Sequence, residues 1–345
     1  MSEPFQPARE VILRGLAEHA FPAASVSVGA HTGARWQESF GRLTYSDAAP
    51  PCRDTTLFDL ASLTKVIATS SLAMRQMAEG RVGLDMRVTD VFKDWSGDWA
   101  SITLRHLLEH SSGLPAHLRA WKEASGRSGY QSLIQRTTLE RRPGEAAVYS
   151  DIGFMLLGLI LESTGGTPID RQFQQLFGRA IDPIQYRPMA HLYERIAPTE
   201  FDPWRGRVLC GEVHDENAAA LGGVAAHAGL FGTAEAAGAF ARLVLRTFRE
   251  STLLGSPELM RVFATRSTVP GSSRALAWDT ALPTSSCGKR MKPGAIGHTG
   301  FTGTSIWIDP EDDFYAVLLT NRVHPTRTNE KLIPLRAQFH DALPR

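Results

Sequence analysis

The chain has 345 residues, of which 43% are hydrophobic and 21% are charged, so it can bury a large core. Its 37 Lys and Arg residues nearly cancel its 36 Asp and Glu residues and leave a formal net charge of +1. A balanced charge without long runs of one sign argues against nucleic acid or acidic lipid as a partner.

The N-terminal residues 1–7 have neither a basic start nor an apolar stretch, so the sequence predicts no secretory signal and a cytoplasmic location. The longest apolar run, residues 152–161, contains two glycines and is shorter than the ~18 residues of a membrane span. The three cysteines, Cys52, Cys210 and Cys287, lie far apart without metal-ligand spacing and indicate a reducing compartment.

Both ends of the chain carry strand patterns with a helix outside them. Near the N-terminus the polarity alternates over residues 24–31, and Gly33 can form the turn of a hairpin. Near the C-terminus two apolar runs are joined by the turn sequence of residues 309–313. The expected elements are helices over residues 7–20 and 329–343 and strands over residues 24–31, 35–45, 304–308 and 314–320.

The middle of the chain is patterned as helices. The one over residues 150–164 is apolar all round, which predicts a buried helix, and it ends at Gly165 and Gly166. Residues 183–224 show no regular pattern. The other expected helices cover residues 62–79, 104–110 and 234–250.

Strands at both termini with helices between them predict an α+β fold, in which one antiparallel sheet is built from both ends of the chain. We expect residues 1–60 and 255–345 to form this sheet lobe with its flanking helices. Residues 61–254 would form an inserted, mainly helical lobe, and an active site would lie between the two.

Ser62 and Lys65 form an S-x-x-K pattern at the start of an expected helix. Positions i and i+3 share a helix face, so the hydroxyl and the ammonium can meet. A desolvated lysine can help to activate a serine, and the helix N-terminus favours developing negative charge. Because this pattern is common, a surface helix that carries it by chance is the alternative interpretation.

Tyr149, Ser150 and Asp151 stand where the buried helix begins, after a turn at residues 142–145. Ser150 or Asp151 can cap the helix while Tyr149 simply packs. The phenol of Tyr149 could also act as a general base if neighbouring cations lower its pKa from ~10.

His298, Thr299 and Gly300 precede Phe301 and an expected strand. A glycine here allows a substrate to approach the backbone closely. The N–H groups of Phe301 and Ser62 could then form an oxyanion hole. The alternative is an ordinary strand end with a histidine that faces solvent.

In this order, the motifs at Ser62, Tyr149 and His298 resemble the three signature elements of the class C β-lactamase and penicillin-binding protein (DD-peptidase) family, namely S-x-x-K, Tyr-x-Asn and Lys-Thr-Gly. The likeness extends over about residues 24–321. Further stretches at residues 58–61, 104–114, 142–145 and 229–234 also resemble this family.

The resemblance implies a two-lobe fold and a serine hydrolase that needs no cofactor or metal. It implies that Ser62 is acylated, that Lys65 and Tyr149 move protons, and that Asp151 contacts the substrate amide. The remaining substrate contacts would come from the sheet edge, through His298, Thr299, Gly300 and Phe301. Hydrolysis of a β-lactam or of a D-Ala-D-Ala-type amide is the activity that these motifs suggest.

Two residues depart from the family pattern. Asp151 replaces the usual Asn; once ionised it cannot donate a hydrogen bond, and its charge tends to raise the pKa of Lys65. His298 replaces the usual Lys and is only partly charged at neutral pH. This second change makes recognition of a substrate carboxylate less expected.

Other functions stay open at this point. A cytoplasmic carboxylesterase, or an amidase or peptidase that acts on muropeptides, would also use a small ester or amide substrate. A non-catalytic ligand-binding relative is a further alternative. The sequence does not indicate an oligomeric state.

A histidine- and acid-rich segment, residues 213–227, matches no zinc-ligand spacing, so we expect it to flank the cleft. Within it, His214 and Asp215 are secondary candidates for substrate contacts.

Overall fold

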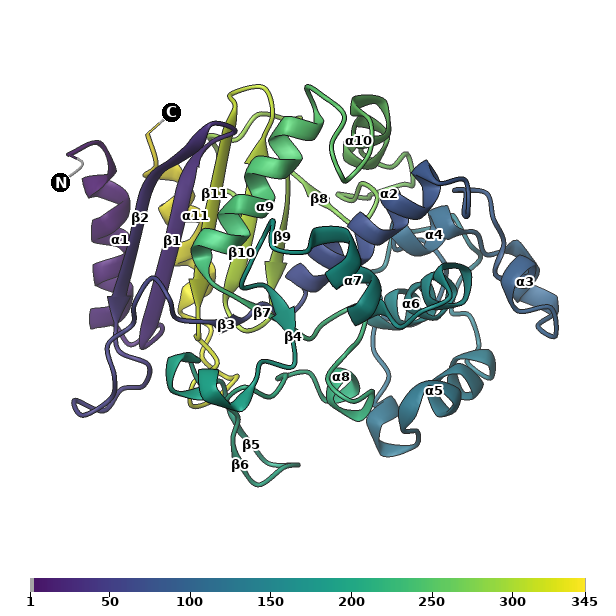
Figure 1. Cartoon of the computed structure of the whole chain (residues 1–345), viewed down its shortest axis with the longest axis horizontal. Helices are drawn as coiled ribbons and strands as arrows, with labels where there is room; N and C mark the ends of the chain where they lie inside the picture. Colours follow the sequence, from purple (N-terminus) through teal and green to yellow (C-terminus); the bar gives the residue numbers. More distant parts are fainter. Residues whose placement is uncertain (1–2, 345) are drawn as a thin grey trace.

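Strands from both ends of the chain form one sheet, as the sequence predicts (Figure 1). The computed structural model describes residues 3–344. Met1 and Ser2, which belong to the N-terminal segment examined for a secretory signal, lie outside the described residues. Within the described range this sheet has six antiparallel strands in the order β2-β1-β11-β10-β9-β8. Their bounds are β1 (Ala23–Ala30), β2 (Gly33–Gly41), β8 (Asp279–Thr280), β9 (Ile296–Gly300), β10 (Thr304–Asp309) and β11 (Phe314–Thr320).

β11 is buried along its whole length because both faces of the sheet are covered. Successive side chains of a strand point to opposite faces. Ala316 and Leu318 accordingly join one hydrophobic cluster, whereas Val317 and Leu319 join another. The two clusters form separate cores on either side of the sheet.

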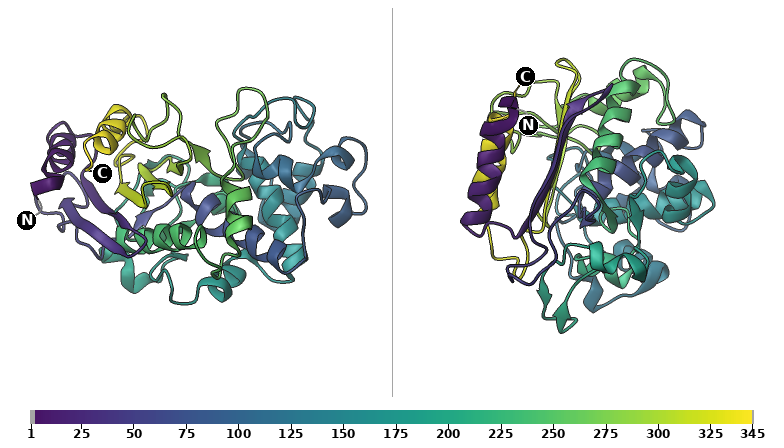
Figure 2. Two further views of the ribbon diagram at one scale, coloured as in Figure 1. Left: turned by 90° about the horizontal axis from the view of Figure 1, so that it is seen from above. Right: turned by 60° about the vertical axis from the view of Figure 1, so that its left-hand side comes forward.

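Three helices cover the two faces (Figure 2). α1 (Gln6–Ala17) and α11 (Leu332–Asp341) pack together on one face, and α9 (Ala234–Thr247) lies against β1, β10 and β11 on the other. Sequence reasoning assigned α9 to the inserted lobe of residues 61–254, but its apolar face packs on the sheet. The proposed division into lobes otherwise stays a prediction.

The helices of the middle segment gather beside the sheet, around α6 (Asp151–Gly165) (Figure 1). The Ser150 hydroxyl accepts a hydrogen bond from the Gly153 N–H at 3.1 Å and caps α6, and Gly166 ends it in the left-handed region with φ +73°. The other α-helices are α2 (Ser71–Ala78), α3 (Val88–Val91), α4 (Leu104–Leu108), α5 (Gly126–Gln135), α7 (Ile169–Phe177), α8 (Glu216–Ala220) and α10 (Pro257–Ala264).

A second, small sheet determines where the Ser62 helix begins. β3 (Phe58–Asp59) pairs with β7 (Leu230–Gly232), which also pairs with β4 (Gln185–Tyr186). The chain leaves β3, turns at Ala61 and enters a helix whose first part, η2 (Lys65–Ser70), is π-helical. α2 continues this helix, so the predicted single helix over residues 62–79 has an irregular first half.

The segment without a sequence pattern, residues 183–224, contains only short elements. They include the hairpin of β5 (Phe201–Asp202) and β6 (Arg207–Val208). Short 3-10 turns occur here and elsewhere, as η1 (Glu3–Phe5), η3 (Gly97–Ser101), η4 (Ala120–Lys122) and η5 (Ala190–Arg195).

Within residues 3–344, no single helix has the length and apolar character of a membrane span. α6 and α7 reach that length only as a pair, and the pair is bent by 69°.

Candidate active site

Ser62 lies between β3 and the helix that contains η2 and α2, and the structure brings Lys65 and Tyr149 to it. The Ser62 Oγ accepts a hydrogen bond from the Lys65 Nζ at 3.1 Å and one from the Tyr149 hydroxyl at 2.8 Å. Lys65 is one helical turn along from Ser62, and Tyr149 comes from the segment that leads into α6. The Lys65 and Tyr149 side chains that sequence reasoning grouped with Ser62 are therefore both hydrogen-bonded to it.

Lys65 is completely buried, yet its amine has three partners. Besides Ser62, the Nζ donates to the Asp151 Oδ1 at 2.7 Å and to the His227 carbonyl at 3.1 Å. Burial by itself lowers the pKa of Lys65, but the Asp151 carboxylate and Tyr149 together outweigh that effect, and the pKa is raised above its ordinary value. Lys65 is therefore a stable ammonium ion.

Asp151, the first residue of α6, forms the other half of this ion pair. Burial opposes its ionisation, but the Lys65 ammonium and a contact from the His117 Nδ1, 3.3 Å from Oδ2, keep its pKa well below the ordinary value. The positive end of the α6 dipole favours the same charge. The expected effect of this carboxylate on the pKa of Lys65 is thus confirmed in direction.

The condition under which Tyr149 could act as a general base, a pKa lowered by neighbouring cations, is not met. Burial raises this pKa by more than the nearby Lys65 lowers it, so the group is a neutral phenol. Its ring lies against cations and a histidine: the Lys65 Nζ is 4.8 Å and the Arg274 Cζ 5.0 Å from the ring centroid, and the His110 ring is 4.6 Å away. Tyr149 is therefore available as a proton relay but not as a standing phenolate.

His298 does not face solvent, because its side chain is 98% buried behind Tyr149, 5.9 Å away between ring centroids. Burial, and then the charges of Arg274 and Lys65, hold its pKa well below 6.5, so the ring is neutral. Its Nδ1 lies 2.8 Å from the Thr299 carbonyl, which can only accept, so this nitrogen carries the hydrogen. The expectation that His298 is partly charged is therefore wrong.

Gly300 and Phe301 bring the end of β9 up to the serine. A Cβ on Gly300 would lie only 2.7 Å from the Leu60 carbonyl oxygen, so only glycine fits at this close approach. The N–H groups of Ser62 and Phe301 have no hydrogen-bond acceptor in the described part of the chain. Both amides are thus available to an oxyanion, as the sequence predicts.

A cavity of about 230 Å³ opens above Ser62. Of the predicted substrate-binding residues, Asp151 and Phe301 line it, whereas His298, Thr299 and Gly300 are not among its lining residues. The two secondary candidates, His214 and Asp215, also line it. The full lining is Ala61, Ser62, His117, Tyr149, Asp151, His214, Asp215, Glu216, Ala228, Phe301 and Arg327.

Hydrogen bonds between histidine and carboxylate side chains hold the acidic side of this cavity in place. The His214 Nε2 lies 2.8 Å from the Glu200 Oε2, and the His227 Nε2 lies 2.8 Å from the Asp215 Oδ1. In the described residues no group of three His, Cys, Asp or Glu side chains is arranged to hold a metal ion. The histidine- and acid-rich segment therefore builds one wall of the cavity.

Arg274 is a functional candidate that sequence reasoning missed. Its guanidinium lies on the Tyr149 ring, and after burial its charge is the strongest influence that lowers the pKa values of His110 and His298. It has no carboxylate partner among the described residues. It comes from an irregular loop before β8, where no motif or periodicity marks a charged residue as functional.

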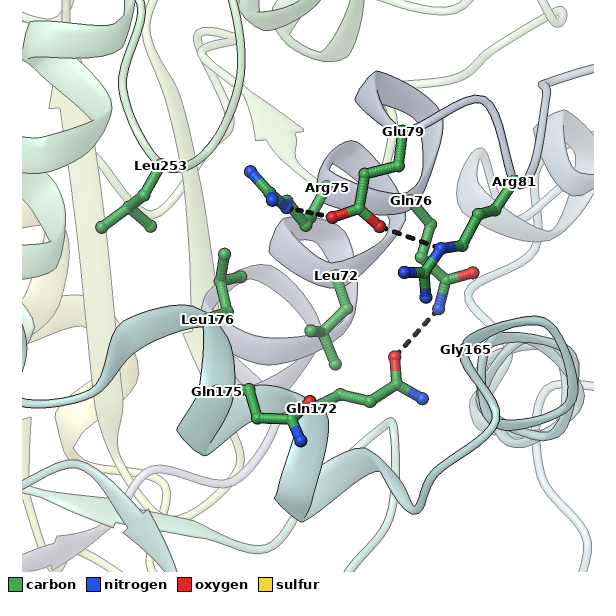
Figure 3. A pocket seen from close by; sticks show the side chains of 10 residues that line it. All are labelled: Leu72, Arg75, Gln76, Glu79, Arg81, Gly165, Gln172, Gln175, Leu176 and Leu253. Carbon is green, nitrogen blue, oxygen red and sulfur yellow. Dashed lines mark hydrogen bonds and ion pairs between the residues drawn. The ribbon is translucent and has the colours of Figure 1, made fainter.

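A second cavity, of about 280 Å³, lies between α2 and α7 (Figure 3). Five of its polar side chains are paired with one another: Glu79 with Arg75 at 2.6 Å and Arg81 at 3.0 Å, and Gln76 with Gln172 at 2.9 Å. None of its lining residues is a serine, threonine, cysteine or lysine. It therefore has no group that could act as an acyl-transfer nucleophile.

The chain is similar to known proteins along most of its length. Residues 8–341 match the family model described as Beta-lactamase. A putative D-alanyl-D-alanine carboxypeptidase of Escherichia coli K12 is 32% identical over 303 residues, which cover 78% of this chain and 70% of that protein. A protein of the same description from Salmonella enteritidis PT4 is 30% identical over 321 residues, with coverages of 83% and 74%.

Solved structures share the fold over almost the whole chain. A penicillin-binding protein homologue from Caulobacter crescentus superposes with a TM-score of 0.79 at 17% identity, covering 99% of this chain and 97% of that one. Simvastatin synthase from Aspergillus terreus gives a TM-score of 0.78 at 17% identity, with coverages of 99% and 98%. At such low identity these likenesses establish the fold alone.

Proposed function

The chain belongs to the beta-lactamase family and is a serine hydrolase, and on that basis we propose that Ser62 is its nucleophile and that a D-alanyl-D-alanine-type peptide is its substrate. The observation that carries the first part is the pair of hydrogen bonds on the Ser62 Oγ, from Lys65 at 3.1 Å and Tyr149 at 2.8 Å. A serine held by an ammonium and a phenol is arranged for attack on an acyl carbon.

Tyr149 is the group that moves the proton in this proposal. Lys65 is held as an ammonium ion by Asp151, so it cannot accept the Ser62 proton. With substrate bound, the Tyr149 hydroxyl turns its hydrogen from the Ser62 Oγ toward the leaving nitrogen. As the Oγ then forms its bond to the acyl carbon, the Ser62 proton passes to the Tyr149 oxygen. The phenol's own proton passes to the leaving nitrogen, whose bond to the acyl carbon breaks. No free phenolate is needed, which agrees with the raised pKa of Tyr149.

Hydrolysis of the acyl-enzyme reverses this relay. Water attacks the acyl carbon and gives a proton to Tyr149, and Tyr149 returns its proton to the Ser62 Oγ as the ester bond breaks. The Lys65 ammonium stabilises the negative charge that develops on both oxygens. The N–H groups of Ser62 and Phe301 receive the oxyanion, and each such donor typically contributes about 10²–10³ in rate.

The position of Arg274 is an argument for a substrate whose leaving group ends in a carboxylate. The neutral His298 cannot supply the cation that a Lys-Thr-Gly motif would place there. The guanidinium of Arg274, without a carboxylate partner among the described residues, lies on the ring of Tyr149 instead. A planar guanidinium can bind a carboxylate through two parallel hydrogen bonds. The relatives described as carboxypeptidases favour the same substrate class.

The test compares the activities of wild type and of a variant without the Arg274 cation on two substrates. Wild type should release D-alanine from a peptide that ends in D-Ala-D-Ala. R274A should lower kcat/KM for this peptide by about 10²-fold, as for loss of a charged hydrogen-bond pair, and should change turnover of the neutral ester p-nitrophenyl acetate less than about threefold. Adding H298K to R274A should restore part of the peptide activity, because it returns a cation to the motif.

An equal loss on both substrates would refute the role of Arg274. Failure of wild type to release D-alanine, with rapid turnover of neutral esters, would instead favour the second candidate, a carboxylesterase. The neutral state of His298 is the observation that supports this alternative, since a neutral ester needs no cation beside the motif.

A further inference from the structure

The residue immediately before the nucleophile is held in an unfavourable backbone conformation. Ala61 has φ +47°, in the left-handed region that costs a residue with a Cβ about 1–2 kcal/mol. Such a conformation persists only where the surroundings enforce it. At Ala61 it decides the direction of the next peptide group, whose N–H belongs to Ser62.

The Asp59 carboxylate enforces this conformation. Its Oδ1 accepts a hydrogen bond from the Ala61 N–H at 2.8 Å, and its Oδ2 accepts one from the His214 N–H at 2.7 Å. The side chain is 98% buried, and in residues 3–344 no lysine or arginine forms an ion pair with it. It is therefore an acceptor dedicated to two backbone amides, one in the nucleophile turn and one in the cavity wall.

The same short segment also holds the second amide of the oxyanion hole. The Thr302 hydroxyl donates to the Asp59 carbonyl at 2.7 Å, and the Thr304 hydroxyl donates to the Leu60 carbonyl at 3.1 Å. These bonds attach the turn between β9 and β10, which carries Phe301, to the end of β3. Asp59 thus contacts the three pieces of chain that surround the oxyanion site.

We propose that Asp59 is a positioning residue for the oxyanion hole, which holds Ala61 in the left-handed region so that the Ser62 N–H points at the substrate oxygen. It touches neither the substrate nor the reacting atoms. The inference rests on the proposed function only in taking Ser62 as the nucleophile. It does not depend on which acyl group is cleaved.

The central experiment is a double-mutant cycle between Asp59 and Ala61, measured with p-nitrophenyl acetate. In D59N the amide can accept from one N–H, but its NH₂ group meets the other. We expect kcat to fall by about 10²–10³ and KM to change less than about threefold, because the oxyanion forms only in the transition state. A glycine enters the left-handed region without strain, so D59N/A61G should recover at least tenfold of the lost kcat.

Asp309 provides the matched control. Its buried carboxylate also accepts from two backbone amides, those of Lys292 at 2.9 Å and Asp312 at 3.3 Å, but it stands at the opposite end of β10 from the site. D309N should lower the melting temperature as D59N does and leave kcat within about threefold of wild type. A purely structural role for Asp59 would make the two variants alike.

The inference is overturned if folded D59N keeps wild-type kcat, or if D59N/A61G recovers none of the loss. Should D59N fail to fold, A61V and A61G decide the matter, since a β-branched residue tolerates positive φ far less than glycine. A61V must then lose at least tenfold more kcat than A61G, and equal kcat values reject the inference. Because the ester needs no Arg274, inactivity on D-Ala peptides would reject the proposed substrate and leave this inference standing.

Discussion

The Lys65 ammonium lies closer to the Asp151 carboxylate, at 2.7 Å, than to the Ser62 hydroxyl, at 3.1 Å. The ion pair is buried, with Lys65 completely shielded from solvent. A carboxylate at this position raises the pKa of the lysine and so favours its ammonium form, whereas the neutral Asn of the motif that Asp151 replaces would not. This contact therefore decides which group near Ser62 can take up a proton.

Asp151→Asn should change the pH dependence of the reaction. Burial is the largest single influence on the pKa of Lys65, and without the carboxylate only Tyr149 opposes it, so we expect the pKa to fall below the ordinary value. Lys65 can then lose its proton and serve as a second base, so kcat/KM of the variant relative to wild type should rise between about pH 6 and pH 10. A ratio that stays constant across pH would contradict this account. Initial rates with p-nitrophenyl acetate, corrected for spontaneous hydrolysis, provide the measurement.

Ser62→Ala should abolish the covalent intermediate. Loss of the nucleophile in a serine hydrolase typically lowers kcat by about 10⁴-fold or more. Intact-mass spectrometry after exposure to a fluorophosphonate should show one adduct on wild type and none on the variant. The matched variant S101A, at an exposed serine in η3, should still be labelled. An adduct on S62A within the cavity would assign the nucleophile to another residue.

Tyr149→Phe should distinguish the role of the phenol oxygen from the role of the aromatic ring. The aromatic contacts with Lys65 and His110 remain, so the fold should be kept, but the relay oxygen 2.8 Å from Ser62 is lost. We expect kcat to fall by about 10²–10⁴ with little change in melting temperature. The control is Y130F, which removes another buried phenol, bonded to Asn217 at 3.0 Å, and should alter kcat less than about threefold. Comparable activity of the two variants would exclude the relay.

Glu200→Gln should lose less of its free energy of unfolding than wild type does as the pH falls. Burial would raise the pKa of Glu200, but hydrogen bonds from His214 and Arg327 outweigh it and lower the pKa to about 2. A carboxylate whose pKa is depressed by folding adds stability above its ordinary value of 4.5, and this part is lost as the pH falls toward about 2.

Urea unfolding at pH 6, 4.5 and 3 measures this effect. E200Q should be less stable than wild type at pH 6 by about 1–3 kcal/mol, because it leaves charged and polar partners unpaired. The difference should shrink between pH 4.5 and pH 3. E250Q, at an exposed glutamate, serves as the control and should track wild type at every pH. A difference that is the same at pH 6 and pH 3 would show that Glu200 does not titrate in this way.

The sequence predicts the sheet and the nucleophile group because both depend on local patterns. The alternating run in β1, the cap at Ser150 and the spacing of Ser62 and Lys65 each act over a few residues. The shared burial of His298, Tyr149 and Lys65 depends instead on packing between distant segments, so the neutral phenol and imidazole could not be foreseen.

The role of Arg274 could not be predicted from the sequence for the same reason. Its loop has no periodicity, and only the fold places its side chain on Tyr149. The positive φ of Ala61 likewise follows from a contact with Asp59, not from the identity of alanine. The cytoplasmic location stays a prediction.

β1 pairs with β11, which lies much later in the chain, so this part of the sheet cannot form until β11 has been synthesised. During translation Ser62 and Lys65 emerge from the ribosome well before Phe301 and the strands that flank it. A nascent chain therefore carries the reactive hydroxyl without its second amide donor. We expect a ribosome-bound chain to be catalytically silent until the last strands leave the exit tunnel and close the sheet.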